Sequence, residues 1–195
     1  MSTMNVYSRF GGKDGVIEGA RAKIAVDLST TGSTVERRSS EALAKKGIVL
    51  LDAPVSGGSH GAEAGTLAMM VSGPEAQFTI AEPFIKVLGK VFYLGTDSGA
   101  GQTMKLINNM VGAACTIATF EALVFGTKAG LDPKQMCEVL SAGGGINIAT
   151  THKVPKCVLP RTFPKLFTTD LMYKDVRLGA EEAERSSARQ KQRTP

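Results

Sequence analysis

Two short apolar segments with a helical pattern between them constrain the fold of this chain more than any other feature. Lys23–Leu28 is rich in β-branched and aliphatic residues, and Ile48–Leu51 is a continuous apolar run typical of a strand buried on both faces of a parallel sheet. Between them, Ser29–Ser33 suits a helix N-terminus, and Thr34–Lys46 reads as a helix that Gly47 ends. Strand, helix and strand together predict one βαβ unit and an α/β fold.

The α/β pattern continues for two more strands and then gives way to helices. Leu67–Val71 and Val91–Leu94 read as strands, with a helix at Pro74–Leu88 that begins with Pro and Glu. Along Gly101–Ala129 apolar residues recur at three- and four-residue steps, which predicts one long helix. Further helices are expected at Asp132–Leu140, near Ile146–His152, and at Asp170–Arg185.

These elements divide the chain into four segments. Residues 1–22 have no sustained period and predict an irregular lead-in. Residues 23–97 form the α/β part, and residues 98–185 form an all-helical part. Residues 186–195 are rich in Arg, Lys, Ser and Gln and predict a solvated basic tail. The sequence therefore predicts an α/β layer followed by an all-α part.

Composition places the chain among soluble globular proteins of one or two domains, because 43% of its 195 residues are hydrophobic and 21% are charged. A membrane span needs roughly 18 or more uncharged apolar residues, and the longest candidate, Leu106–Phe120, is short and carries two asparagines. The N-terminus has no apolar run typical of a signal peptide. We therefore expect a cytoplasmic protein with no membrane partner.

Cysteine and charge exclude two further classes of function. Cys115, Cys137 and Cys157 are widely spaced, with no CxxC pair and only two histidines in the chain, which predicts reduced thiols and no metal site. The net charge of +5 is concentrated near the C-terminus, and aromatic residues make up only 6% of the chain. Nucleic-acid modules combine basic residues with exposed aromatic ones, so no nucleic-acid partner is expected.

The segment Asp52–Gly58 (DAPVSGG) leaves the carboxyl end of a predicted buried strand. Open parallel sheets bind ligands at such ends, and Ser56, Gly57 and Gly58 can present a hydroxyl and bare backbone N–H groups to a carboxylate. The alternative is a flexible loop, because serine and glycine are also common in turns. Spacing alone favours the binding function only slightly.

The segment Gly99–Asn109 (GAGQTMKLINN) begins the long predicted helix. Lys105 and Asn109 are four residues apart and therefore share one helical face with apolar neighbours. A lysine in a partly apolar site loses basicity and can act as a general acid or base near neutral pH. The alternative, which is commoner on sequence alone, is a surface lysine whose ammonium extends to water.

Together these segments resemble the β-hydroxyacid dehydrogenase family, which includes 3-hydroxyisobutyrate dehydrogenase and tartronate semialdehyde reductase. Asp52–Gly58 is similar to the substrate loop of the family, and Gly99–Asn109 to its G-x-G-x-x-x-K-x-x-N-N segment. Val26–Thr30 looks like the strand end beside the nicotinamide, and Asp170–Asp175 like the helix whose lysine closes over the cofactor site. The resemblance runs from about Ile24 to Glu184.

The resemblance implies a fold and a reaction. The fold is the C-terminal part of a Rossmann-type parallel sheet over residues 23–97, followed by a helical domain like that of 6-phosphogluconate dehydrogenase. The reaction is hydride transfer between NAD or NADP and a small 3-hydroxy acid or semialdehyde. Family members assemble through the helical part, so a homo-oligomer is also expected.

Site roles follow from the same resemblance. Lys105 would protonate or deprotonate the substrate oxygen, or stabilise charge there, and Asn109 would orient Lys105 and the substrate. Ser56, Gly57 and Gly58 would hold the substrate carboxylate. These residue types suit a reaction that needs one proton-transfer group and a clamp for the carboxylate.

The cofactor-binding residues implied are Thr30 and Lys174, and they are an incomplete set. The family opens with a strand, a G-x-G-x-x-G turn and a residue about 20 positions later that selects NAD or NADP. Two further βαβ units would need roughly 60 residues before Lys23, and only 22 are present. The sequence alone therefore predicts a piece of a family member, cut at both ends, with an exposed sheet edge.

Two further departures concern the substrate wall and the C-terminus. At Ser141–Asn147 the family more often has a serine followed by an arginine, which leaves the substrate undefined. The Lys174 helix continues into Arg185–Pro195 and not into the terminal helices of the family.

Two other functions stay open on sequence grounds. Gly57–Gly61 fits G-x-S-x-G, the nucleophile elbow of serine hydrolases, with Ser59 as nucleophile and His152 as the only later histidine. That elbow requires a helix directly after the serine, where glycines stand here. The other alternative is an inactive dehydrogenase remnant that keeps the fold and binds no cofactor.

Overall fold

The computed structural model describes the chain except for residues 1–9, 11–14, 20, 165 and 192–195. The predicted irregular lead-in therefore lies largely outside the described residues, and within it η1 (Val16–Glu18) is a single 3-10 turn. The described residues form two compact units. The chain passes from the first to the second after Ile107, and it rejoins the first at Lys174.

The first unit contains a two-stranded sheet, a three-stranded sheet and the helices that cover them. It contains β1 (Ile24–Asp27), α2 (Ser33–Ala44), β2 (Val49–Asp52), β3 (Val55–Ser56), α3 (Gly58–Ala64), β4 (Leu67–Val71), α4 (Glu75–Ile85), η2 (Lys86–Leu88) and β5 (Gly89–Tyr93). β1 pairs in parallel with β2, and β4 pairs in parallel with β5. A bridge between Asp52 and Ser72 joins β2 to the end of β4. The predicted α/β class with a parallel sheet is confirmed.

One strand was not predicted from the sequence and is antiparallel to its neighbour. β3 is antiparallel to β4, with Val55 opposite Met69 and Ser56 opposite Ala68. A parallel connection needs a crossover of a dozen or more residues, and only ten residues separate Ser56 from Leu67. The short connection therefore returns the chain antiparallel, a feature that the sequence pattern did not predict.

The glycine-rich segment after β3 is a helix and not a flexible loop. Gly57 and Gly58 have positive φ angles of 134° and 63°, which turn the chain from β3 into α3. Gly65, with φ 65°, ends α3 in the left-handed conformation. Glycine accepts these angles without steric cost, so the residues that suggested a loop are those that permit a strand-to-helix turn.

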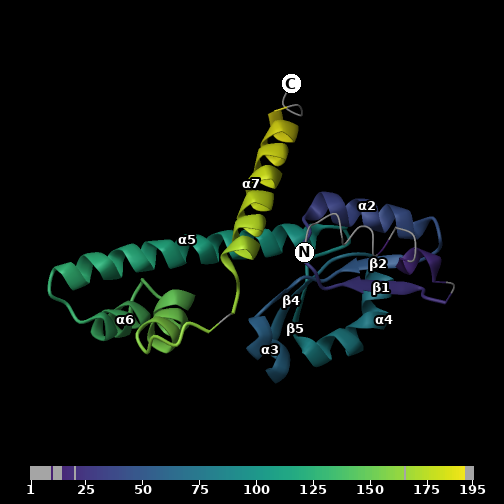
Figure 1. The fold of residues 1–195 in the computed structure, drawn as a ribbon. Helices are drawn as coiled ribbons and strands as arrows, with labels where there is room; N and C mark the ends of the chain where they lie inside the picture. Colours follow the sequence, from purple (N-terminus) through teal and green to yellow (C-terminus); the bar gives the residue numbers. More distant parts are fainter. Residues whose placement is uncertain (1–9, 11–14, 20, 165, 192–195) are drawn as a thin grey trace. The chain divides into compact units, whose positions relative to one another are not determined.

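Side chains of β2 alternate between two faces of the sheet. Leu51, fully buried, packs in a cluster with Phe78 and Ile85 of α4, whereas Leu50 packs with Leu43 of α2. α2 and α4 therefore lie on opposite faces of the strands, as Figure 1 shows. This double coverage explains why β2 reads as a continuous apolar run.

The second unit is helical. Its elements are α5 (Ala100–Lys128), whose first turns belong to the first unit, α6 (Pro133–Ala142), the π-helix η3 (Ala149–Val158) and the start of α7 (Thr169–Lys191). α6 begins at Asp132, whose carboxylate accepts a hydrogen bond from Gln135 N at 2.9 Å. Leu123, Cys137 and Val154 form the core between α5, α6 and η3.

Two boundaries differ from the sequence prediction. The compact units divide inside α5, whereas the pattern placed the change near Asp97–Gly101. α7 continues beyond Arg185 to Lys191, so part of the predicted basic tail is helical. Glutamate, arginine and glutamine favour helices, and Glu181 forms ion pairs with Arg177 and Arg185 one turn away on each side.

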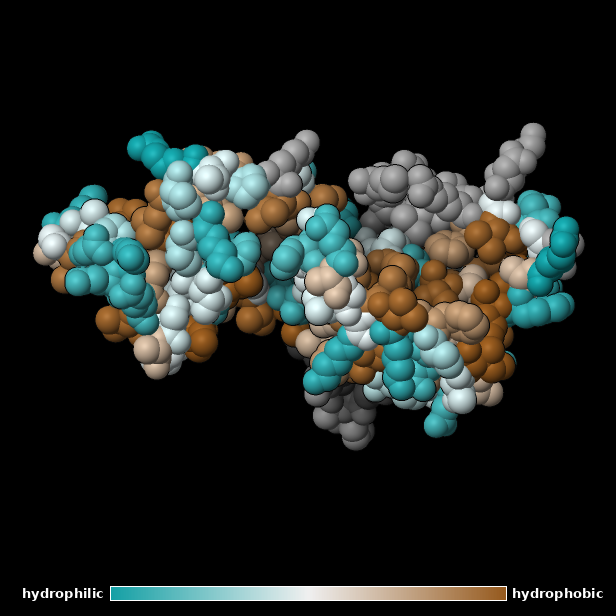
Figure 2. All heavy atoms as spheres, turned by 90° about the horizontal axis from the view of Figure 1, so that it is seen from below, coloured by the Kyte–Doolittle hydropathy of each residue, from teal (hydrophilic) through white to brown (hydrophobic). Residues whose placement is uncertain are grey.

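Exposed apolar residues are a feature of both units. Ile80 and Phe84 of α4 and Val87 of η2 are 60–78% exposed. Figure 2, which views the molecule from the side where α4 lies in Figure 1, shows hydrophobic surface there. By length and composition alone, α5 is also long and apolar enough to cross a membrane, which the sequence prediction did not anticipate. Such a helix is weak evidence for a membrane span, and α5 buries Gln102 and Lys105 near its start.

We expect Gly101→Ala to destabilise the chain, because a Cβ at Gly101 would lie 2.3 Å from Met70 O and 2.8 Å from Asp52 Oδ2. Relieving that overlap costs about 1–3 kcal/mol or more. Gly112→Ala, in the same helix, is the control, since a Cβ there meets nothing within 4 Å and removes a helix-interior glycine. Urea unfolding of both variants should show opposite changes, and equal stability of the two would contradict this packing.

Candidate active site

Lys174 and Thr30 are far apart in sequence and meet in the first unit. Lys174 Nζ donates a hydrogen bond to Thr30 O at 2.5 Å and forms an ion pair with Asp175 Oδ1 at 2.8 Å. Thr30 follows β1, and Lys174 lies in the second turn of α7. The two residues predicted to contact cofactor are thus adjacent, and Asp175, which sequence reasoning did not single out, fixes the ammonium of Lys174.

Lys105 is a buried lysine, with only 7% of its surface exposed, in the second turn of α5. Burial lowers the pKa of its amine, the carboxylate of Asp175 partly opposes this, and the ammonium of Lys174 lowers the pKa further. The surface-lysine alternative is therefore wrong for Lys105. A buried amine beside a carboxylate and a second ammonium has the electrostatic surroundings of a proton-transfer group.

Asn109 follows Lys105 by one helical turn along α5 and is also 7% exposed. Its Oδ1 accepts a hydrogen bond from Asn108 Nδ2 at 3.1 Å, which orients the amide. An asparagine amide contains both a donor and an acceptor group, which suits a positioning role. Its assignment as a positioning residue stays a prediction.

Ser56, Gly57 and Gly58 lie at the turn from β3 into α3. Ser56 is half-buried at the edge of β3, and a Cβ at Gly57 would come within 3.0 Å of the Leu67 side chain, so only glycine fits there. The backbone of this turn is therefore tightly specified. Its predicted role as a carboxylate clamp stays a prediction.

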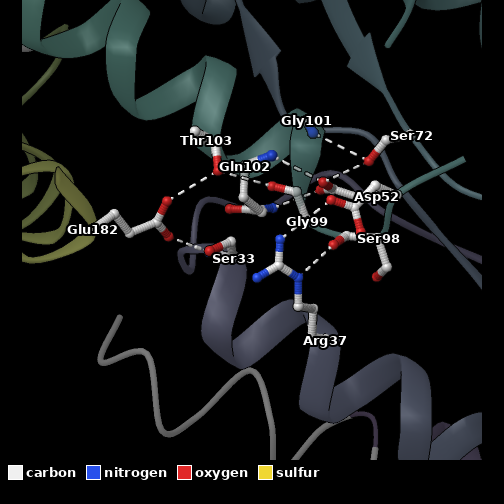
Figure 3. Close-up of polar contacts among 11 residues, drawn as sticks. Ser33, Arg37, Asp52, Ser72, Ser98, Gly99, Gly101, Gln102, Thr103 and Glu182 are labelled. Atoms are coloured by element: carbon white, nitrogen blue, oxygen red, sulfur yellow. Dashed lines mark hydrogen bonds and ion pairs between the residues drawn. The ribbon is translucent and has the colours of Figure 1, made fainter. Parts of the chain in front are cut away.

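A hydrogen-bond network that sequence reasoning missed centres on Gln102 and Asp52 (Figure 3). Gln102 N and Nε2 donate to the two carboxylate oxygens of Asp52, each at 2.9 Å. The Gln102 side chain also donates to Ser29 O at 2.9 Å and accepts from Thr31 N at 2.8 Å and Gly32 N at 3.1 Å. One buried side chain thus joins the loop after β1, the end of β2 and the start of α5.

Ser72 completes the surroundings of Asp52. Ser72 Oγ donates to Asp52 Oδ2 at 3.1 Å and accepts from Gly101 N at 3.1 Å. Burial raises the pKa of Asp52 to about 6, although the hydrogen bonds from Gln102 and Ser72 act in the opposite direction. Asp52 is therefore a buried structural carboxylate that holds the N-terminus of α5.

The N-terminus of α2 is occupied by protein groups. Thr31 N and Gly32 N donate to Gln102, and Ser33 N donates to Glu182 Oε1 at 2.5 Å. Thr103 Oγ1 holds the other oxygen of Glu182 at 3.0 Å (Figure 3). Because these N–H groups are already paired, this helix end does not offer the anion site that a dinucleotide phosphate requires.

Glu36 is a fully buried acid on α2, with 1% of its surface exposed. Burial, followed by the charges of Asp52 and Asp27, raises its pKa to about 10. Among the described residues no cation forms an ion pair with it. Glu36 is therefore protonated at neutral pH.

A folded-state pKa above the unfolded value makes this acid a source of pH-dependent instability. The folded chain keeps the proton on Glu36, so this residue does not lower the free energy of unfolding below about pH 4.5. As the pH rises from there towards 10, the free energy of unfolding falls by about 1.4 kcal/mol per pH unit. We expect Glu36→Gln to be more stable than the parent chain at pH 8 and to show a smaller loss of unfolding free energy above about pH 5. A difference between the two that does not change with pH would contradict a protonated Glu36.

Some of these residues carried a signal in the sequence and others did not. Asp52 and Gln102 stand inside the two motifs that were singled out, but nothing in a motif shows that they bond to each other. Glu36 precedes Ser39 by three residues and Leu43 by seven, and all three lie on one buried helix face. This helical spacing is visible in the sequence. Asp175 ends the segment Asp170–Asp175 that was singled out, whereas Glu182 had no local signal, and both reach their partners through the return of α7.

The fold and these residues define a class of protein. An α/β unit with helices on both faces of its parallel strands is the architecture on which dinucleotide-binding domains are built, with the ligand beside the carboxyl ends of the strands.

Comparison with known families places the chain within that class. The NAD binding domain of 6-phosphogluconate dehydrogenase matches residues 2–95, and the NAD-binding domain of NADP-dependent 3-hydroxyisobutyrate dehydrogenase matches residues 99–192. The two matches together extend over nearly the whole chain, and the first begins upstream of Ile24, where the resemblance was expected to start.

Individual relatives agree with the family matches. The chain is 38% identical over 178 residues to 2-(hydroxymethyl)glutarate dehydrogenase of Eubacterium barkeri, a match that includes 90% of this chain and 59% of that protein. It is 37% identical over 187 residues to 3-hydroxyisobutyrate dehydrogenase of Pseudomonas aeruginosa, covering 92% and 63% of the two chains. The structure of 3-hydroxyisobutyrate dehydrogenase of Mycobacterium tuberculosis with L-serine superposes with a TM-score of 0.80 at 32% identity, covering 95% and 64%.

The chain belongs to the β-hydroxyacid dehydrogenase family. The predicted family and fold class are confirmed. The chain spans about three fifths of the length of the curated relatives that it matches.

Proposed function

We propose that this chain carries the proton-transfer and substrate-binding groups of an NAD(P)-dependent dehydrogenase that interconverts a small 3-hydroxy acid and its semialdehyde. The observation that carries the proposal is Lys105, a buried amine with a lowered pKa near Asp175 and Lys174. A lowered pKa increases the fraction of neutral amine near neutral pH, as a general base requires.

In the oxidation direction, neutral Lys105 Nζ accepts the proton of the substrate hydroxyl while the carbon that bears this hydroxyl loses hydride. In the reduction direction the ammonium returns a proton to the carbonyl oxygen. Asn109 orients the reacting oxygen, and the turn at Ser56, Gly57 and Gly58 holds the carboxylate of the substrate. Holding the two ends of a small acid fixes the position of its reacting carbon. The reaction is faster because the reacting groups are already oriented.

The residues present fit the nicotinamide end of the cofactor. Thr30 O and the ammonium of Lys174 form a polar pair after β1, and the paired N–H groups of α2 leave no phosphate cradle there. When bound, NAD or NADP supplies the two-electron hydride acceptor or donor. Thr30 and Lys174 would border its nicotinamide, whereas the described residues contain no G-x-G-x-x-G turn for the pyrophosphate.

The names of the relatives guide the choice of substrate. One relative is named for 2-(hydroxymethyl)glutarate and another for 3-hydroxyisobutyrate, and both are small acids that carry a hydroxymethyl group beside a carboxylate. We propose a substrate of this class and a cytoplasmic location. Serine hydrolysis has less support. A helix does follow the turn at Gly57 and Gly58, contrary to the sequence prediction, but Ser59 is the second residue of that helix and not the turn residue that an elbow nucleophile occupies.

We expect Lys105→Ala to lower turnover of 3-hydroxyisobutyrate by roughly 10²–10⁴-fold, because it removes the proton-transfer group. The free energy of unfolding should change little, because the variant also removes the cost of burying a charged group. Lys128→Ala, in the exposed last turn of α5, is the control and should retain the parent activity.

The same experiment separates an enzyme from an inactive remnant. NADH fluorescence measured with the parent chain and with Lys105→Ala should report cofactor binding by both. An active Lys105→Ala variant would overturn the role of this lysine. A parent chain that binds no NADH or NADPH at millimolar concentration would identify the chain as a remnant.

We also propose that two copies of the chain associate through α5. In the second unit, Val111, Ile117, Val124 and Phe125 are 57–76% exposed, which is unusual for large apolar residues of an isolated helix. Sedimentation velocity should show a dimer, and Phe125→Glu should shift it to monomer while the helical content by circular dichroism stays the same. A monomeric parent chain would refute this assembly.

A further inference from the structure

β1 has one edge that no strand covers in the described part of the chain. It is the end strand of its sheet and pairs on one side only, with β2. The carbonyl groups of Lys23 and Asp27 accept hydrogen bonds from the β2 side, at 2.9 Å each. Because the backbone groups of successive residues in a strand point to opposite edges, those of Ile24 and Val26 point away from β2. Two N–H and two C=O groups therefore face the open edge.

The middle of β1 lacks the features that protect an edge strand from pairing. Natural edge strands are blunted by prolines, bulges or charged side chains, and Ile24, Ala25 and Val26 include none of these. Ile24 and Val26 pack in the cluster that contains residues of α4, and Ala25 packs in the cluster that contains Leu43 of α2. Both faces of the strand are thus covered while its edge can accept a further strand.

The two ends of β1 carry opposite charges. Lys23 directly precedes the strand, is exposed, and forms no ion pair with any described residue. Asp27 ends the strand, and its Oδ1 accepts hydrogen bonds from Ser29 N and Oγ at 2.8 and 2.6 Å. Its Oδ2 has no hydrogen-bond partner among the described residues. Lys23 and Asp27 point to one face of the strand, because residues an even number apart share a face.

We infer that two copies of the chain pair β1 with β1 in an antiparallel arrangement, so that their sheets join across a twofold axis. A twofold axis brings the same surface of both copies together, and a strand that meets its own copy in this way runs antiparallel to it. This inference does not depend on the dehydrogenase activity proposed above. The contact is also separate from the association proposed through α5.

A register centred on Ala25 satisfies the backbone groups and the charges together. Ile24 of one copy then lies opposite Val26 of the other, and each of the two such pairs exchanges two N–H···O bonds. Lys23 of one copy lies opposite Asp27 of the other, at a position where Cα atoms are about 4.5 Å apart. Opposite charges that face each other across strands stabilise the pairing. A register centred on Val26 would separate Lys23 from Asp27 and lose both charge pairs.

The contact is small, since β1 has only four residues. A small interface is weak and transient, so β1 pairs at a higher concentration than α5. The Phe125→Glu variant, which disrupts the α5 face, is therefore the starting chain for the test. It is expected to be monomeric when dilute and to dimerise through β1 when concentrated.

Amide hydrogen exchange of single residues detects this pairing directly. We expect exchange of the Ile24 and Val26 N–H groups to slow by about tenfold as the protein is concentrated, because both become hydrogen-bonded. The N–H groups of Ala25 and Asp27 face β2 and are the internal control. Their protection should be the same at every concentration.

Charge reversal tests the register. Lys23→Glu places a like charge opposite Asp27 in both pairs and should raise the Kd of the dimer by about tenfold in sedimentation equilibrium. Lys46→Glu, at an exposed residue just after α2, changes the net charge equally and should leave the Kd unchanged. Protection of the Ala25 and Asp27 amides verifies that β1 still pairs with β2 in each variant.

Three outcomes would overturn the inference. Protection of the Ile24 and Val26 amides at every concentration would mean that another part of the same chain covers the edge. Fast exchange of both amides at every concentration would mean that the edge stays open. Equal effects of Lys23→Glu and Lys46→Glu would mean that net charge, and not the pairing of β1 with β1, controls the association.

Discussion

The pairing of Gln102 with Asp52 is the contact on which the first unit depends. The amide of Gln102 donates to Asp52 and to Ser29 O and accepts from the backbone of Thr31 and Gly32, so each of its polar groups has a partner away from water. A buried carboxylate is tolerated only when such bonds replace its hydration. This network fixes where α5 begins, and with it the position of Lys105 one turn later.

The same network decides what the N-terminus of α2 cannot do. Its N–H groups are paired with Gln102 and Glu182, which closes that helix end to phosphate and limits the proposed cofactor contacts to the nicotinamide end. The two lysines near this network also differ in their surroundings. Asp175 pairs with Lys174 while Lys105 stays buried with a lowered pKa, so two lysines of similar intrinsic basicity occupy different environments.

Glu36 shows the cost of crowding acids in one core. Its carboxyl lies near Asp52 and Asp27 and takes up a proton that it would lose in water. Asp52 is stabilised by Gln102 and Ser72, whereas Glu36 has no cationic partner among the described residues, which explains why the pKa of Glu36 rises more than that of Asp52.

The sequence by itself determined the βαβ unit, the long helix and the family, because hydrophobic period and the motifs at Asp52–Gly58 and Gly99–Asn109 are local properties. It also placed Lys105 and Asn109 on one helical face, which follows from 3.6 residues per turn. Only the tertiary structure decided that β3 runs antiparallel, that Lys105 is buried, and that α7 returns Lys174 to Thr30 and Glu182 to Ser33. The contacts of α7 and of the start of α5 join residues about 70 to 150 positions apart, and local pattern carries no information about which distant groups meet.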